Sequence, residues 1–243
     1  MTALLEVEGI SRSFGALRAL SEASLTVRPG SITALIGPNG SGKTTLFNVI
    51  TGYLRADAGR VRFDGHDVTG AKPARLYRHG LCRTFQQARV FAELTVMENL
   101  VVAGGFTLPE LFRRRVGRAD RDRAGALAEE FRLSHVADLY AAELSYGQRK
   151  LLEFAAVLMS RPKLVLLDEP TAGVNPVLVD TMARHVVSKQ AEGVTFLIVE
   201  HDMSFVMRLC DPVIVLVQGR EICVGPPALV QDDPAVLDAY LGA

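Results

Sequence analysis

Residues 37–44 read Gly-Pro-Asn-Gly-Ser-Gly-Lys-Thr and match the pattern G-x-x-x-x-G-K-[ST]. The apolar run Ile32–Ile36 before them is typical of a short buried strand, and Leu46–Ile50 after them is typical of a helix. The glycines allow successive backbone N–H groups to turn toward one phosphate, and the start of the helix adds partial positive charge. This feature predicts an α/β fold that holds a phosphate group between a strand and a helix.

The residues of this phosphate loop have separate expected tasks. Lys43 is expected to reach the β- and γ-phosphates of a nucleotide, and the Thr44 hydroxyl is expected to bind Mg²⁺. The predicted nucleotide-binding residues of the loop are Gly37, Asn39, Gly40, Ser41, Gly42, Lys43, Thr44 and Thr45.

A second motif follows another apolar run. Leu164–Leu167 is followed by Asp168 and Glu169, and ligands of open α/β sheets bind where the strands end. Asp168 is predicted to hold Mg²⁺ through water, and Glu169 to polarise an attacking water as a general base. The residues alone leave open that these acids end a strand only to face solvent.

Short apolar runs alternate with helix-like segments in the last third of the chain. Phe196–Val199 and Val213–Val217 are predicted strands, and Pro176–Gln190 and Met203–Leu209 are predicted helices. This alternation, together with Leu164–Leu167, indicates a parallel sheet covered on both faces.

The N-terminal part is different. Leu4–Ile10 and Ala23–Val27 are predicted strands, Gly59–Gly65 alternates like a hairpin strand, and Leu81–Phe85 is a further strand candidate. Helix-compatible residues dominate from Thr95 to Ser160. We therefore expect a nucleotide-binding core with a β-subdomain, formed by residues 1–87 and 162–243, and a helical subdomain formed by residues 88–161.

Composition narrows the class of protein. The chain has 27 Lys and Arg against 27 Asp and Glu, so it has no excess of basic residues. A protein that binds nucleic acid mainly through its charge is therefore not expected. Cys82, Cys210 and Cys223 are far apart and form neither a disulfide framework nor a zinc pattern. No run approaches the roughly 20 apolar residues of a membrane helix, and the first residues lack signal-peptide character. A soluble cytoplasmic protein is expected from these features.

Four further segments carry a family resemblance. Leu144–Gln148 reads L-S-Y-G-Q and resembles the L-S-G-G-Q signature of the ATP-binding subunits of ABC transporters, with Tyr146 in place of the first glycine. Thr84–Gln86 is similar to the glutamine loop of that family, and Val199–Asp202 to its switch-histidine segment. Ala172–Asn175 stands at the D-loop, where many members read S-A-L-D. The motifs occur in the family's order over most of the chain.

The resemblance implies a fold and an activity. The expected fold is a P-loop NTPase of the ABC ATPase type, of α/β class, with an N-terminal antiparallel β-subdomain and an inserted α-helical subdomain. The expected activity is ATP hydrolysis that powers transport, with ATP and Mg²⁺ as cofactors.

The resemblance also implies site residues. Phe14 is expected to stack on adenine, for which its flat face is suited, although a phenylalanine in the core is the alternative. Gln86 has an amide oxygen for Mg²⁺ or water and is chosen over the adjacent Gln87 because it follows the phenylalanine. His201 is able to donate to the γ-phosphate. Ser145, Gly147 and Gln148 form a second phosphate-binding surface, directed at ATP on the opposite subunit. The expected catalytic residues are Lys43, Gln86, Glu169 and His201, and the expected metal ligands are Thr44, Gln86 and Asp168.

An arginine-rich stretch, Arg113–Arg123, is interleaved with Asp120 and Asp122. Its expected role is a solvated helical face. Contact with a permease or with anionic lipid headgroups is the alternative.

Finer features resemble the branched-chain amino-acid importers of the ABC family. These are Arg83–Gln86, Leu94–Leu100, Ala172–Pro176 and Ala239–Gly242. The resemblance implies attachment to integral-membrane permease subunits at the cytoplasmic face of the membrane, with Ala88–Leu100 receiving the permease's coupling helix. It also implies a second, identical or paralogous ATP-binding subunit and an indirect link to a solute-binding protein. The implied function is uptake of branched-chain amino acids or of a similar small polar solute, powered by ATP-driven dimerisation. A lipopolysaccharide-type exporter ATPase and a stand-alone ATPase acting on nucleic acid are the alternatives.

Overall fold

The computed structural model describes residues 3–84, 90–104 and 117–241. The strands are β1 (Leu5–Phe14), β2 (Leu17–Val27), β3 (Ile32–Ile36), β4 (Ala58–Phe63), β5 (His66–Asp67), β6 (Leu81–Arg83), β7 (Leu164–Asp168), β8 (Thr195–Val199), β9 (Val213–Val217) and β10 (Arg220–Gly225). The helices are α1 (Lys43–Ile50), α2 (Pro73–His79), α3 (Val96–Ala103), α5 (Arg118–Glu130), α6 (Tyr146–Met159), α7 (Pro176–Ala191), α8 (Met203–Leu209), α9 (Pro227–Gln231) and α10 (Pro234–Leu241), with the 3-10 turns η1 (Ser134–Val136) and η2 (Ala141–Glu143).

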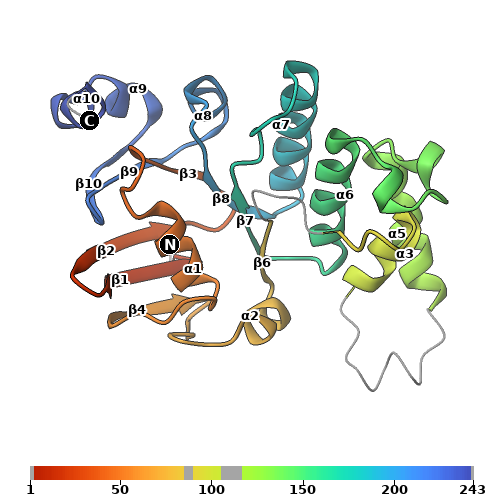
Figure 1. Ribbon diagram of the computed structural model, residues 1–243, viewed down its shortest axis with the longest axis horizontal. Helices are drawn as coiled ribbons and strands as arrows, with labels where there is room; N and C mark the ends of the chain where they lie inside the picture. The colour runs from red at the N-terminus through yellow and green to blue at the C-terminus, as the bar shows by residue number, and fades with distance from the viewer. Residues whose placement is uncertain (1–2, 85–89, 105–116, 242–243) are drawn as a thin grey trace.

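The described strands form two sheets (Figure 1). The larger has the order β10-β9-β3-β8-β7-β6, in which β9, β3, β8, β7 and β6 run parallel and β10 pairs antiparallel with β9. Every residue of β3, β7 and β8 is buried, as the apolar runs predict. Because these strands are parallel, the segments that follow β3, β7 and β8 meet at one edge of the sheet. The phosphate loop, Glu169 and His201 lie in those segments.

The central sheet is covered on both faces, as predicted, because side chains alternate along its strands. In β7, Val165 and Leu167 belong to one buried cluster, and Leu164 and Leu166 belong to a second. The first cluster includes residues of α5, α6, α7 and α8. The second joins the sheet to α1 and to the antiparallel sheet.

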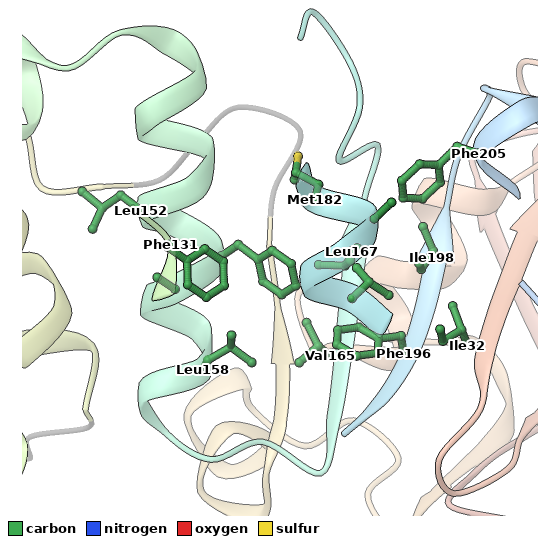
Figure 2. Close-up of a cluster of buried hydrophobic side chains, with 14 of the residues drawn as sticks. Ile32, Phe131, Leu152, Leu158, Val165, Leu167, Met182, Phe196, Ile198 and Phe205 are labelled. Atoms are coloured by element: carbon green, nitrogen blue, oxygen red, sulfur yellow. The ribbon is translucent and has the colours of Figure 1, made fainter. Parts of the chain in front are cut away.

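The helical segment packs its buried side chains directly against the sheet. Figure 2 shows Leu158 of α6 beside Val165 of the sheet, and Phe131, the C-cap of α5, farther from the sheet in the same buried cluster. The ring of Phe154 in α6 meets Phe131 edge-on at 5.4 Å and Phe196 at 6.2 Å between centroids. These contacts orient α6, and thus the signature at its start, relative to β7 and β8.

The smaller sheet is antiparallel with the order β2-β1-β4-β5, which confirms the predicted N-terminal β-subdomain. Two of its strands are longer than the apolar pattern predicts. β1 continues to Phe14 and β2 begins at Leu17. The two strands therefore form a hairpin whose end contains mostly polar residues. Register shifts between Ile10 and Arg12 and again between Arg12 and Ser13 break the alternation, which is why the pattern ended early.

Other differences lie between the motifs. The strand expected over Leu81–Phe85 ends at Arg83, and Phe85 lies outside the described residues. The elements α2, β10, α9 and α10 were not predicted. Among the described residues, no helix is both long and apolar enough to cross a lipid bilayer.

The arginine-rich stretch is a solvated face only in part. Arg118 is 95% exposed and lies 3.9 Å from Asp122, one helical turn along α5. Arg123 contradicts the prediction, because its guanidinium donates to the carbonyl oxygens of Met159 (3.0 Å) and Leu158 (2.5 Å). It thereby satisfies carbonyls at the C-terminal end of α6. Residues 113–115 lie outside the described part of the chain.

Candidate functional site

The phosphate loop connects β3 to α1 and has no room for side chains at two of its glycines. Gly37 has φ 151°, and a Cβ there would lie 2.0 Å from the carbonyl oxygen of Leu216. Gly42 has φ 101°, and a Cβ there would lie 2.6 Å from the carbonyl oxygen of Ala19. The loop is therefore fixed between β2 and β9 in a conformation that requires glycine.

Helix α1 begins directly at the loop. Gly42 is its N-cap and has no side chain to cap the first turn, and the first intrahelical bond runs from Leu46 N to Gly42 O at 2.8 Å. The N–H groups of Lys43, Thr44 and Thr45 precede that bond, so they point out of the helix's N-terminal end. Such an end favours an anion through its donors and its dipole. The Thr44 side chain is exposed there.

The Lys43 side chain folds back along the loop. Its Nζ donates to the carbonyl oxygens of Gly37 (2.8 Å) and Pro38 (2.9 Å) and lies 3.4 Å from Ser41 Oγ. Burial lowers the pKa of the Lys43 ammonium, and the nearby Glu169 carboxylate partly offsets that effect. Asn39 and Gly40 are exposed at the tip of the loop. The structure thus joins the predicted phosphate-binding residues into one cradle with its cation inside.

The Asp168 carboxylate ends β7 and is buried. Arg83 Nη2, from the end of β6, donates to Asp168 Oδ2 at 2.6 Å. The backbone N–H of Asp168 also lies 3.4 Å from Thr84 Oγ1, at the start of the segment that leads to Gln86. Sequence reasoning did not find Arg83, although an arginine directly after the buried pair Leu81-Cys82 was a signal for a paired charge.

The backbone of Glu169 has a left-handed conformation, unlike that of the preceding strand residue Asp168. Glu169 has φ 48°, a left-handed conformation that costs a non-glycine residue about 1–3 kcal/mol and clusters at functional sites. Its Oε1 lies 3.0 Å from His201 Nε2, which follows β8. Its N–H donates to Val199 O at 2.9 Å, which anchors this turn to β8. The predicted base and the predicted switch histidine therefore lie in direct contact.

The residues at this edge of the sheet fit Mg²⁺ by their chemistry. Mg²⁺ prefers hard oxygen donors and keeps several of its waters. The exposed Thr44 hydroxyl and the Asp168 carboxylate are such donors. Arg83 engages Oδ2 of Asp168, and a carboxylate has about four lone-pair sites, so the group retains capacity for a metal-bound water. The third expected ligand, Gln86, lies outside the described residues.

The signature residues form the N-terminus of α6. Ser145 is the N-cap, and its Oγ accepts from Gln148 N (3.3 Å) while Gln148 Oε1 accepts from Ser145 N (2.9 Å). This capping box leaves the Ser145 hydroxyl hydrogen and the Gln148 amide donors for a ligand. In the described part of the chain, no hydrogen bond or ion pair joins Ser145, Gly147 or Gln148 to the phosphate loop.

Two departures from the usual motifs have local structural explanations. Tyr146, in place of a signature glycine, donates from its hydroxyl to Ala172 O at 3.1 Å, so it connects α6 to the D-loop segment. Asn175 is the N-cap of α7 and its Oδ1 accepts from Leu178 N at 2.9 Å. An asparagine performs this cap as well as the aspartate common at this position.

Phe14 lies at the end of β1 with 47% of its surface exposed, so it is not a core residue. The guanidinium carbon of Arg12 lies 5.1 Å from the centre of its ring. An exposed ring at the end of a strand has a face available for a flat partner.

Comparison with known proteins agrees with this geometry. Residues 20–172 match the ABC transporter family model, and residues 220–243 match a model described as branched-chain amino acid ATP-binding cassette transporter. A probable branched-chain amino acid transport ATP-binding protein of Methanocaldococcus jannaschii is 41% identical, over 98% of this chain and 97% of its own length. A high-affinity branched-chain amino acid transport ATP-binding protein of Pseudomonas aeruginosa is 39% identical, over 98% of each chain.

Solved structures show the same fold. The crystal structure of a nucleotide-free ATP-binding cassette from an ABC transporter is 40% identical, with a TM-score of 0.88 and complete coverage of both chains. A crystal structure of the ADP conformation of an ATP-binding cassette matches equally well, which supports nucleotide binding. With the family model matching more than half of its length, this chain belongs to the ABC transporter family as an ATP-binding cassette ATPase.

Proposed function

We propose that this chain is the ATP-hydrolysing subunit of an importer for branched-chain amino acids. The observation that carries the choice of substrate class is the C-terminal match over residues 220–243, because that model describes branched-chain amino acid cassettes rather than cassettes in general. The names of the relatives at 36–41% identity support the same substrate class.

In this proposal, ATP binds with its adenine on the Phe14 ring and its phosphates in the loop of residues 37–45. The N–H groups at the start of α1 and the Lys43 ammonium stabilise the phosphate charge. Thr44 and Gln86, and Asp168 through water, would hold Mg²⁺, which would supply positive charge to neutralise the phosphate oxygens.

Hydrolysis needs a water aligned with the γ-phosphate. Glu169 accepts a hydrogen bond and then a proton from that water. With its proton on Nε2, His201 donates to Glu169 Oε1 at 3.0 Å and so orients the carboxylate. When ATP is bound, the same N–H would donate to the γ-phosphate in place of Glu169. The preorganised contact between the two side chains supports this division of tasks.

The signature serves the neighbouring subunit. Ser145, Gly147 and Gln148 contact ATP held by a second, identical or paralogous cassette, so that two nucleotides are enclosed in a head-to-tail dimer. The core of residues 1–87 and 162–243 binds nucleotide, and the helical subdomain of residues 88–161 moves inward on closure. The permease's coupling helix contacts residues 88–100, which places the chain peripherally at the cytoplasmic face of the membrane.

Reconstitution tests the transport role. The chain is co-expressed with candidate permease subunits and a second cassette, and the purified complex is placed in liposomes with a solute-binding protein. We expect ATP-dependent uptake of labelled leucine that requires Glu169 and that unlabelled isoleucine or valine reduces. Uptake of another small polar solute in place of leucine would contradict the substrate class. Co-purification with lipopolysaccharide or with RNA, and not with the permease, would favour one of the alternatives.

A further inference from the structure

Glu200 is a buried carboxylate directly after β8, with 2% of its surface exposed. It accepts four hydrogen bonds from two different segments. Its Oε1 accepts from the N–H and from the hydroxyl of Thr171, each at 2.7 Å. Its Oε2 accepts from the N–H of His201 at 2.9 Å and of Asp202 at 3.3 Å. A buried charge is tolerated only where bonds of this kind replace its lost hydration.

The two segments carry the proposed base and the proposed switch histidine. Thr171 lies two residues after Glu169, and His201 follows Glu200 directly. Together with the contact between Glu169 Oε1 and His201 Nε2, the bonds of Glu200 close a ring that joins the ends of β7 and β8. The left-handed backbone of Glu169 is a conformation that persists only where its surroundings over-determine it.

Glu200 itself does not resemble a base. Its two oxygens are engaged by four donors and its surface is inaccessible, so a substrate water has no approach to it. We propose that Glu200 is a positioning residue that holds Glu169 and His201 in their mutual geometry for ATP hydrolysis. This inference rests on the proposed roles of those two residues. The charge matters as well as the shape, because bonds to an ionised acceptor are about twice as strong as neutral ones.

The isosteric variant Glu200→Gln tests this role. The amide keeps one acceptor oxygen but directs an NH₂ at two of the four donors, so the two hydrogen bonds on that side are lost. We expect kcat for ATP to fall about 10–100-fold, as for other groups that orient active-site residues. The Kd for ATP is expected to stay within about twofold, because the phosphate loop is not touched. Glu192→Gln, which changes a carboxylate that is 58% exposed at the end of α7, is the matched control.

Thr171 provides a second, milder series. Thr171→Val removes the hydroxyl donor and keeps the N–H, and we expect an intermediate loss of kcat. Thr171→Ser keeps both donors and should restore wild-type kcat. If Glu200→Gln does not fold, this series decides the question, and a Thr171→Val variant with wild-type kcat then overturns the proposal.

A double-mutant cycle separates positioning from general destabilisation. If Glu200 acts through its neighbours, Glu200→Gln costs little further kcat in a His201→Ala background. A full additional loss in that background contradicts the proposal. Wild-type kcat in Glu200→Gln, with Glu169→Gln and His201→Ala impaired, overturns this inference alone. Wild-type kcat in Glu169→Gln and His201→Ala overturns the proposed roles of those residues instead.

Discussion

The Arg83 guanidinium, at the end of β6, bonds the Asp168 carboxylate at the end of β7 and also bonds two residues of the α1 segment. Its Nη2 donates to Asp168 Oδ2 at 2.6 Å, and the two side chains are only 5% and 8% exposed. Its Nη1 donates to Asn48 Oδ1 at 2.7 Å and Thr51 Oγ1 at 3.1 Å. The helix of the phosphate loop, the end of β7 and the start of the segment that leads to Gln86 are therefore held by one side chain.

Replacing Arg83 should destabilise the fold. Arg83→Ala leaves the Asp168 charge buried without its guanidinium, and we expect a loss of about 3–5 kcal/mol in the free energy of unfolding. Arg83→Lys should also be destabilising, because an ammonium does not replace the planar fork. Urea unfolding measures both. Arg118→Ala, which changes an exposed arginine, should stay within about 0.5 kcal/mol. Equal stability of Arg83→Ala and Arg118→Ala would show that the buried pair contributes little.

Adding a methyl group at Gly42 should damage nucleotide binding. In Gly42→Ala the new Cβ meets the Ala19 carbonyl oxygen, and the φ of 101° is strained for alanine, so the loop must shift. We expect an ATP affinity at least tenfold weaker by equilibrium titration. Gly125→Ala in α5 is the matched control, since its Cβ meets nothing within 4 Å and alanine favours a helix. Unchanged affinity in Gly42→Ala would mean that the loop tolerates the shift.

Removing the Phe14 ring should weaken nucleotide binding without unfolding the protein. Base–aromatic stacking is worth about 1–3 kcal/mol, so Phe14→Ala should raise the Kd for ATP about 5–150-fold. Phe14→Trp should retain the affinity. Leu17→Ala removes a neighbouring side chain that is 69% exposed and should leave the Kd unchanged. If the two alanine variants bind ATP equally well, adenine does not stack on Phe14.

His185 should make the fold sensitive to mild acid. Its ring stacks on Phe131 at 4.0 Å, and burial lowers the pKa of the imidazole while Glu130 partly opposes that effect. The unfolded chain therefore binds a proton more readily, so stability falls as the pH drops below about 6.5, by at most about 1.4 kcal/mol per unit. Urea unfolding at pH 7.5 and 5.5 should show a smaller difference in His185→Gln than in the wild type. The exposed His135→Gln should keep the wild-type difference, and an unchanged difference in His185→Gln would exclude His185 as its source.

The sequence predicts those parts of the fold that one physical requirement determines, such as burial on both faces of a sheet or a backbone that only glycine fits. The strands β3, β7, β8 and β9 are found because a sheet covered on both faces demands continuous apolar runs. The phosphate loop is found because only glycines fit against the Leu216 and Ala19 carbonyls. The hairpin of β1 and β2 is underestimated because its end pairs polar residues with register shifts.

The sequence predicts the motif residues of the site but not the residues that hold them in place. Lys43 follows from the phosphate-loop pattern, Asp168 and Glu169 from acids at the end of an apolar run, and His201 from the family resemblance. Arg83 and Glu200 do not follow in this way, because Asp168 is 85 residues from Arg83 and Thr171 is 29 residues from Glu200, and these pairs meet only once β6, β7 and β8 are side by side. Arg123 is misassigned for the same reason, since the carbonyls that it caps belong to another helix.

Glu169→Gln tests the central claim most directly. The amide keeps the size of the side chain and its contact with His201 but does not accept a proton from water. The phosphate loop and the signature surface are unchanged, so ATP binding and ATP-dependent dimers should persist. Phosphate release and light scattering on the purified chain with ATP and Mg²⁺ measure hydrolysis and dimerisation together. The account predicts a loss of hydrolysis of at least about 100-fold with stable ATP-dependent dimers. Near-wild-type phosphate release would contradict it, because the base would then be another group.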